Sequence, residues 1–268
     1  MNDRCSNQAA DRGEAILIVA LDISAAFDMV IHFILLSSLL NSFGRNGNAL
    51  LWISSYLSRW SQTVRVGSAS STSSSSRCGV PQGSDLGPIL FTVYTSPIAG
   101  VSDAHHMNQQ QYADDKQLDV TFTMLMATAS IHNTEIALHA WFPMNSFTLN
   151  LDKTEMIQMS TTRQAKELLP VTQINVARST IRLSGQLNLL GVILDTALSF
   201  DDQINMCKAS FFHICTLRHI WLPLTEEMAN YVACPSIQSR LYYANYLHTS
   251  MLSANFDKLN GYKTCSCA

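Results

Sequence analysis

The sequence has few charged residues and no long apolar run, and each shortage excludes a class of protein. Charged residues make up 14% and apolar residues 47% of the 268 residues, which excludes a disordered chain, because disorder needs low hydrophobicity and high charge. The most apolar segments, 16–21 and 31–40, are interrupted by Asp22, His32 and serines, well short of the ~18 residues of a membrane span. The polar first fourteen residues contain no signal-peptide core. We expect a globular intracellular protein, nuclear or cytoplasmic, with no membrane partner.

Paired cysteines and clustered positive charge are also lacking. The seven cysteines are odd in number, and the closest pair, Cys265 and Cys267, has no second pair at zinc-finger spacing. We interpret them as reduced thiols. The net charge is −3, and no two of the 17 Lys and Arg residues are adjacent. The chain as a whole therefore has little of the concentrated positive charge that phosphate contacts need.

Apolar periodicity predicts a chain of mixed helices and strands. A short strand with apolar residues on both faces is predicted at 16–21 and ends at Asp22. The serine-rich stretch 67–76 favours a loop, as a connector rather than a phosphorylation tract, because serine side chains compete for backbone hydrogen bonds. The other expected elements are helices at 30–43 and 49–57, a strand at 62–66, a shaped loop at 79–88 that leads into a helix, a hairpin with its tip at 112–115, a helix at 124–142 ended by Pro143, a strand at 154–160, another hairpin within 172–194, and helices at 201–221 and 225–247.

Three aspartates are the main candidates for chemistry. Asp22 ends a strand, and Asp114 and Asp115 occupy a hairpin tip about ninety residues later. Adjacent carboxylates repel each other, and a third acid beside them is explained if divalent cations neutralise the group, as in two-metal sites. Oxygen ligands with no nearby His or Cys favour Mg²⁺ or Mn²⁺ over zinc, and two such ions suit phosphoryl transfer. For the Asp-Asp pair taken alone, a simply solvated turn is the better interpretation.

Five segments occur in a diagnostic order: LDISAAFD (21–28), GVPQGSDLGPILF (79–91), YADDKQL (112–118), LNLDKTE (149–155) and LGVILDTALSFDDQI (190–204). Together they resemble the successive motifs of reverse transcriptases, above all those of non-LTR (LINE-type) retrotransposons, from about residue 16 to about residue 250. The resemblance implies an α+β fold, in which a polymerase palm-like antiparallel sheet with helices on one face is followed by a partial helical thumb. The implied domains are a polar N-terminal segment (1–15), a palm with the fingers largely missing (16–200), a partial thumb (201–250) and a tail (251–268).

The resemblance also implies roles for the acidic residues and their neighbours. Asp22, Asp114 and Asp115 match the family's catalytic, metal-binding acids. Ile23 would contribute a main-chain carbonyl to the nucleotide and metal site. Lys153 matches a basic residue that protonates or screens the leaving pyrophosphate, although taken alone it would be an ordinary solvated lysine. The implied cofactor is a pair of Mg²⁺ or Mn²⁺ ions.

A second group of matches concerns the nucleotide. Phe27 falls where the family places an aromatic residue that stacks under the sugar and excludes a 2′-hydroxyl, whereas its ordinary interpretation is a core aromatic. Gln82 and Gly83 match the loop that lines the nucleotide pocket, where glycine lets the backbone approach the substrate. Tyr112 precedes the acidic pair and is assigned to nucleotide binding with them.

The implied activity is RNA-directed DNA polymerisation, with an RNA template, a DNA primer and a deoxynucleoside triphosphate (dNTP) as partners. Leu190 and Gly191 fall in the hairpin that resembles the primer grip. Two alternatives stay open. One is a catalytically inactive transposon-derived fragment that acts at most as a nucleic-acid or protein interaction module. The other, a palm-type nucleotidyl cyclase, is weaker because the Pro-Gln-Gly loop and the thumb-like tail serve a primer and a template.

Several positions depart from the family pattern. Only about fifteen residues precede the first catalytic strand, where the family has a fingers subdomain of a hundred residues or more. Lys116 puts a cation beside the acidic pair, where we expect it to compete with metal. Asp85 places a charge in a normally apolar slot, and Ile31 replaces an acid. The polar lead-in 107–111 predicts a poorly packed central hairpin.

Overall fold

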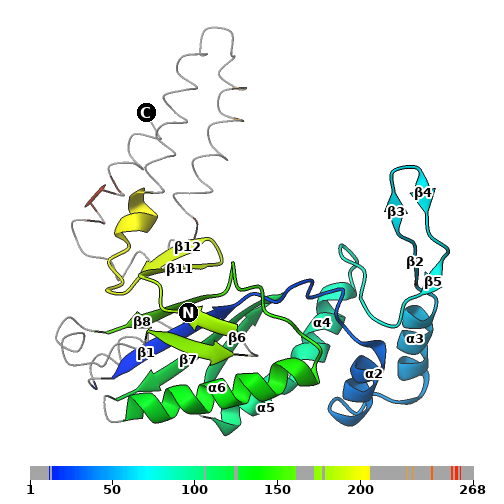
Figure 1. The fold of residues 1–268 in the computed structure, drawn as a ribbon, viewed down its shortest axis with the longest axis horizontal. Coiled ribbons are helices and arrows are strands. Elements are labelled where there is room, and N and C mark those ends of the chain that lie inside the picture. Colours follow the sequence, from blue (N-terminus) through cyan, green and yellow to red (C-terminus); the bar gives the residue numbers. More distant parts are fainter. Residues whose placement is uncertain are drawn as a thin grey trace. The chain divides into compact units, whose positions relative to one another are not determined.

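The computed structural model describes residues 12, 14–105, 107–123, 126–160, 172–176 and 179–205, and seven isolated positions between 228 and 260 (Figure 1). The chain divides into two compact units. One unit comprises Leu17–Met156 and Pro170–Leu183, and the other comprises Met1–Ile16, Ile157–Leu169 and Ser184–Ala268. Apart from helical residues 201–205, the two helices predicted for the thumb lie outside the described residues, as do nearly all of the N-terminal segment and most of the tail.

The main sheet has the strand order β6-β7-β1-β8. Strand β1 (Ala15–Leu21) is an inner strand and is buried along almost its whole length, as an apolar run on both faces predicts. Strands β6 (Asn108–Tyr112) and β7 (Asp115–Phe122) pair antiparallel, with Tyr112 opposite Asp115. Strand β6 is an edge strand in which exposed residues alternate with half-buried ones. This position explains why a polar lead-in forms a strand, and the predicted hairpin is confirmed. The other edge is β8 (Glu155–Met159).

Helices α5 (Pro97–Ala104) and α6 (Ala127–Met144) pack against strands β6 and β7, respectively (Figure 1). Helix α6 ends two residues later than predicted, because Pro143 fits into its last turn without breaking it. Helix α5 was not predicted, since its sequence PIAGVSDA has only a weak apolar pattern. Within the described ranges, no helix is long and apolar enough to cross a membrane.

Helix α4 (Gly87–Thr95) follows the glycine-rich loop as predicted and begins with proline in its first turn. Its inner side carries Phe91 and Tyr94, both fully buried, which contact Phe147 with ring centroids 6.1 and 5.4 Å away. The Tyr94 hydroxyl donates to the backbone oxygen of Asn145 (3.0 Å). This aromatic core fixes α4 against the segment that follows α6.

Helices α2 (His32–Asn41) and α3 (Gly47–Ser58) confirm the predicted pair. The prediction of a loop at 67–76 is wrong in part, because this stretch pairs with the residues before it to form a two-stranded arm. The strand predicted at 62–66 is found as two short strands, and the two-residue strands within 67–76 were not predicted because so few residues cannot show alternation. The arm consists of β2 (Ser61–Gln62) paired with β5 (Ser74–Ser75), and β3 (Arg65–Val66) paired with β4 (Ala69–Ser70).

The alternating residues between 172 and 194 form two hairpins, not one. Strands β9 (Gln173–Val176) and β10 (Ser179–Arg182) pair antiparallel in the first unit, where β9 contacts α6. Strands β11 (Gln186–Leu189) and β12 (Val192–Asp195) pair in the second unit. Each strand pair closes through its own turn, which a single alternating pattern does not distinguish.

Candidate active site

Asp22 is positioned by its backbone. It follows the buried strand β1 directly, its N–H donates to the Thr154 hydroxyl (3.2 Å), and its carbonyl accepts from the Asn150 N–H (3.0 Å). The next residue, Ile23, is buried and forms an antiparallel bridge with Leu149. The motif 149–155 therefore acts as a brace for the end of β1. Thr154 and Asn150 were not among the predicted site residues, although both lie within a motif that the sequence singled out.

The acidic pair lies at the tip of the β6–β7 hairpin. Ala113 and Asp114 form the two-residue turn, with Ala113 in the left-handed region (φ 52°). Asp115 is the first residue of β7, opposite Tyr112, and both are exposed. Tyr112 is 70% exposed, so its ring lies free at the hairpin tip rather than in the core.

Three of the predicted catalytic residues act electrostatically on the fourth, Asp115. Partial burial raises the pKa of the Asp115 carboxyl, repulsion from Asp114 and then from Asp22 raises this pKa further, and attraction to Lys153 partly offsets the rise. These residues come from three separate segments of the chain. The fold therefore brings the end of β1, the hairpin tip and the 149–155 brace within interaction range of one another.

The donor chemistry of this acidic site, Asp22, Asp114 and Asp115, fits hard divalent cations, because carboxylates that repel each other are stabilised by a shared positive charge. The carboxylates of the acidic site are not arranged as a complete metal-binding group. Among the described residues, no group of three or more His, Cys, Asp or Glu side chains is disposed to hold a metal ion.

The expectation that Lys116 competes with metal is not supported. Successive strand residues point to opposite faces, and Lys116 is buried (2% exposed) on the face away from Asp115. Its ammonium donates to the Gln111 side chain (2.7 Å) and lies 5.6 Å from the centre of the Trp141 ring of α6. Burial lowers the pKa of Lys116 to about 7. Gln111 also donates to Thr95 (3.0 Å), so the polar hairpin is held by a partly buried hydrogen-bond network instead of packing poorly.

The loop at 79–88 is tied to the segment that follows Asp22. Gly79 N–H donates to Val30 (2.8 Å), and Val80 N–H donates to Phe27 (2.9 Å). Gln82 and Gly83 form an exposed turn, with Gly83 at φ 78°. Asp85, expected to place a charge in an apolar slot, is also exposed.

Ser84 and Gly87 shape the end of this loop. The Ser84 hydroxyl accepts from the Gly87 N–H (3.0 Å) and donates to the Pro81 carbonyl (2.8 Å). These bonds join the exposed turn at Gln82 and Gly83 to the first residue of α4.

Phe27 packs against the core and stays partly accessible. Its half-buried ring stacks on the fully buried ring of Phe91, with centroids 4.9 Å apart and planes 28° apart. One side of Phe27 thus belongs to the core, and part of the side chain stays accessible on the segment that begins at Asp22.

Leu190 and Gly191 form the tight turn of the β11–β12 hairpin in the second unit. Both have positive φ, 49° and 79°, the requirement of the hairpin turns whose twist matches the strands. The Tyr243 hydroxyl donates to the Leu190 carbonyl, and its ring would lie 3.5 Å from a Cβ placed on Gly191. Leu190 is 43% exposed.

An antiparallel hairpin with the acidic pair at its tip and helices packed on its strands belongs to a fold of mixed helices and antiparallel strands, which is consistent with a polymerase palm. The sequence profile described as reverse transcriptase (RNA-dependent DNA polymerase) matches residues 2–194. The chain therefore belongs to the reverse transcriptase family, and the predicted likeness to LINE-type retrotransposon enzymes is confirmed.

Two relatives in Drosophila melanogaster illustrate the match. The probable RNA-directed DNA polymerase from transposon BS is 31% identical over 72% of this chain, and that from transposon X-element is 29% identical over 75%. The chain spans only about a fifth of their lengths, 21% and 22%. A solved structure of apo telomerase from Candida tropicalis, truncated from its C-terminal domain, matches 75% of this chain and 39% of that chain, with a TM-score of 0.50 and 10% identity. This last likeness shows the fold alone.

Proposed function

We propose that residues 16–200 form the palm of an RNA-directed DNA polymerase and that residues 201–250 begin its thumb. The reaction is transfer of a nucleotide from a dNTP to the 3′-hydroxyl of a DNA primer on an RNA template. The observation that carries this proposal is the electrostatic interaction of Asp115 with Asp114, Asp22 and Lys153, because these are the residues that the family's motifs assign to catalysis. Family membership supplies the reaction class.

In this proposal Asp22, Asp114 and Asp115, with the main-chain carbonyl of Ile23, hold two Mg²⁺ or Mn²⁺ ions. When bound, such ions supply activation of the attacking hydroxyl and stabilisation of the leaving pyrophosphate oxygen. Lys153 offsets charge on the pyrophosphate side of the reaction. The Thr154 and Asn150 contacts to the Asp22 backbone orient the first acid towards the hairpin tip.

The remaining residues position the substrates. Phe27 stacks below the sugar of the incoming nucleotide, supported from behind by Phe91. The exposed turn at Gln82 and Gly83 lines the nucleotide pocket together with Tyr112. Leu190 and Gly191, at the tip of their own hairpin, grip the primer.

Primer extension on an RNA template with Mg²⁺ or Mn²⁺ tests this function. Asp114→Asn and Asp115→Asn should each reduce the extension rate at least about a hundredfold, the scale on which removing a charge-stabilising group acts. Asp103→Asn, an exposed acid of α5 outside the acidic site and the nucleotide loop, is the matched control and should extend like the unmodified chain. Equal extension by the unmodified chain and Asp114→Asn would eliminate the polymerase proposal.

A second candidate is a catalytically inactive, transposon-derived module that binds nucleic acid or protein. The observation in its favour is that the described residues contain no three acidic, His or Cys side chains disposed to hold a metal ion. It predicts no extension product with either ion, even at high enzyme concentration, together with retained binding of nucleic acid.

A further inference from the structure

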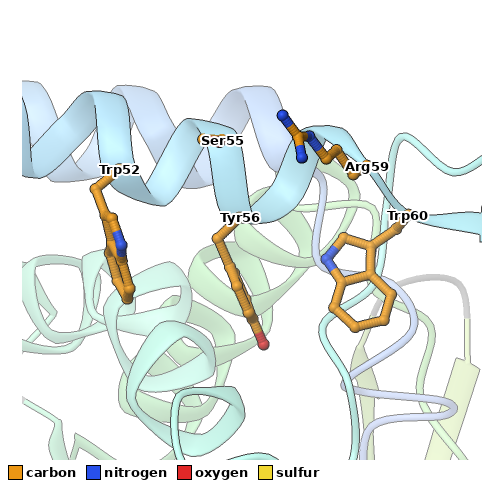
Figure 2. Close-up of a pocket in the computed structure, with 5 residues that line it drawn as sticks. All are labelled: Trp52, Ser55, Tyr56, Arg59 and Trp60. Carbon is orange, nitrogen blue, oxygen red and sulfur yellow. The ribbon is translucent and has the colours of Figure 1, made fainter.

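Three aromatic side chains form a row along one side of α3 and its C-terminal end. Trp52 and Tyr56 are four residues apart, which places them on one face of α3, and Trp60 follows two residues after the helix ends at Ser58. Figure 2 shows all three rings projecting to the same side. The Trp52 and Tyr56 rings are nearly parallel (14°), with centroids 6.2 Å apart, and Tyr56 meets Trp60 edge-on at 5.8 Å. We call these three residues the aromatic row.

The aromatic row is not part of the core. Trp52 is 58% and Trp60 is 39% exposed, whereas the buried side of α3 is represented by Leu57. The rings line an open groove of about 360 Å³ together with Ser55 and Arg59 (Figure 2). Large aromatic faces left accessible on a helix are unusual unless something binds them.

The surrounding segment is positively charged, although the whole chain is not. No acidic residue occurs between Asp28 and Asp85, a stretch that contains four arginines, Arg45, Arg59, Arg65 and Arg77. Among the described residues, none of these arginines takes part in an ion pair. The complete sequence has little concentrated positive charge, but this segment has a net positive charge that suits a polyanion.

The two-stranded arm continues directly from the aromatic row. The Trp60 carbonyl accepts from the Ser76 N–H (2.9 Å) at the base of the arm. Beyond it, Arg65 and the hydroxyl groups between Ser68 and Ser75 are exposed. Arginine and hydroxyl side chains are typical donors to phosphate and sugar oxygens.

We infer that the aromatic row and the arm form a binding site for single-stranded RNA, built on different elements from those that carry the acidic site. Bases stack on accessible aromatic faces while arginines contact the backbone, a combination that tolerates any sequence. Successive ring centroids are 6.2 and 5.8 Å apart, against ~3.4 Å between stacked bases of a duplex strand. An unpaired strand can spread successive bases to this spacing freely, whereas a duplex must unstack its base pairs at each step.

The choice of RNA over DNA rests on the proposed function, in which the template is RNA. The hydroxyl-rich arm is consistent with this choice, because a ribose 2′-hydroxyl can exchange hydrogen bonds with serine. The polyanion itself follows from the arginines and the absence of acidic residues, and does not depend on polymerase activity.

Fluorescence anisotropy with a labelled 12-nucleotide oligo(U) RNA tests the site. The triple variant Trp52→Ala, Tyr56→Ala, Trp60→Ala should weaken binding at least about tenfold, since each stacked base contributes a large part of the affinity. Leu51→Ala, which removes a 68% exposed apolar side chain from the same helix, is the matched control and should bind like the unmodified chain. The double variant Trp52→Phe, Trp60→Phe should keep most of the RNA affinity that the triple alanine variant loses, because phenylalanine can still stack on bases.

Three results would overturn the inference. The first is unchanged RNA binding by the triple variant. The second is that duplex RNA or oligo(dT) binds as tightly as oligo(U) and loses this binding in the triple variant. The third is that the triple variant changes from dimer to monomer in sedimentation without a change in RNA affinity. Asp115→Asn keeps this inference separate from the proposed function, because it should lose primer extension and still bind oligo(U). If the unmodified chain extends no primer but binds RNA through the aromatic row, the polymerase proposal fails and the RNA site stands.

Discussion

Gly87, the first residue of α4, lies directly against the carbonyl of Pro81. A Cβ at position 87 would stand 2.7 Å from that oxygen and 3.1 Å from the Ser84 hydroxyl. Real Cβ atoms do not approach a backbone oxygen so closely, and Pro81 is held in place by the hydrogen bond from Ser84 (2.8 Å). The exposed turn at Gln82 and Gly83 is therefore fixed by a glycine that lies outside it.

Gly87→Ala should destabilise the fold by about 1–3 kcal/mol, the usual cost of forcing an extra carbon into a packed site. Thermal unfolding monitored by circular dichroism measures this loss. Gly100→Ala in α5 is the matched control, since a Cβ there meets nothing within 4 Å, and alanine should stabilise that helix by up to about 1 kcal/mol. Two substitutions of the same chemistry would thus act in opposite directions, and equal effects would contradict the close contact.

Lys116→Met should stabilise the protein at pH 7 by on the order of a few kcal/mol, because burial without a counter-charge penalises the ammonium and methionine carries no charge. The reason is that Lys116 is buried against Trp141, where burial lowers its pKa to about 7. Gln111 keeps a second partner through the Thr95 hydroxyl (3.1 Å). Chemical denaturation measures the gain. Lys116→Ala also removes the charge but leaves a cavity, so a gain as large as that of methionine would argue against burial as the cause.

Asp119 makes stability depend on pH. Burial raises the pKa of its carboxyl, and the hydrogen bond from the Gln117 amide partly lowers this pKa again. The folded state therefore binds the proton more tightly than the unfolded state, and the contribution of Asp119 to stability falls as the pH rises from the unfolded-state pKa through the folded-state pKa. Below both pKa values the carboxyl is protonated in the folded and the unfolded state, so Asp119 does not lower the stability there.

Asp119→Asn should accordingly raise stability at pH 7 by on the order of 1 kcal/mol and leave it nearly unchanged at pH 3. Denaturant titrations of both proteins across this pH range give the difference curve. Asp103→Asn, on an exposed position of α5, should give a flat difference curve. A difference that grew towards low pH would reverse the sign and contradict the raised pKa.

Much of the acidic site could be predicted from the sequence because its signals are local. A run of apolar residues that ends at Asp22 predicts a strand end, and turn residues between alternating segments predict the hairpin that carries Asp114 and Asp115. Strand alternation alone would also have placed Lys116 on the opposite face from Asp115. The expectation that Lys116 competes with metal rested only on its position next to the acidic pair in the sequence.

Other features depend on contacts that no local pattern records. The strands of the serine-rich arm are two residues long and exist only through pairing across the arm. The need for glycine at position 87 comes from Pro81 in the folded loop. Trp52 lies on a segment correctly predicted as helical and Trp60 lies just beyond its end, but large aromatic residues are usually buried, so their exposure required the structure.

The acidic site itself should respond to divalent ions even if turnover is slow. Because partial burial, and then repulsion from Asp114 and Asp22, raise the pKa of Asp115, Asp115→Asn should slightly stabilise the metal-free protein, by under about 1 kcal/mol since solvent screens these charges. Mg²⁺ should raise the melting temperature of the unmodified chain, because an ion that binds only the folded state stabilises it, and Asp115→Asn should lose most of this rise. Asp85→Asn should keep it. A melting temperature that rises with Mg²⁺ equally in all three proteins would show that the ion binds elsewhere, and the acidic site would then have no role in holding metal.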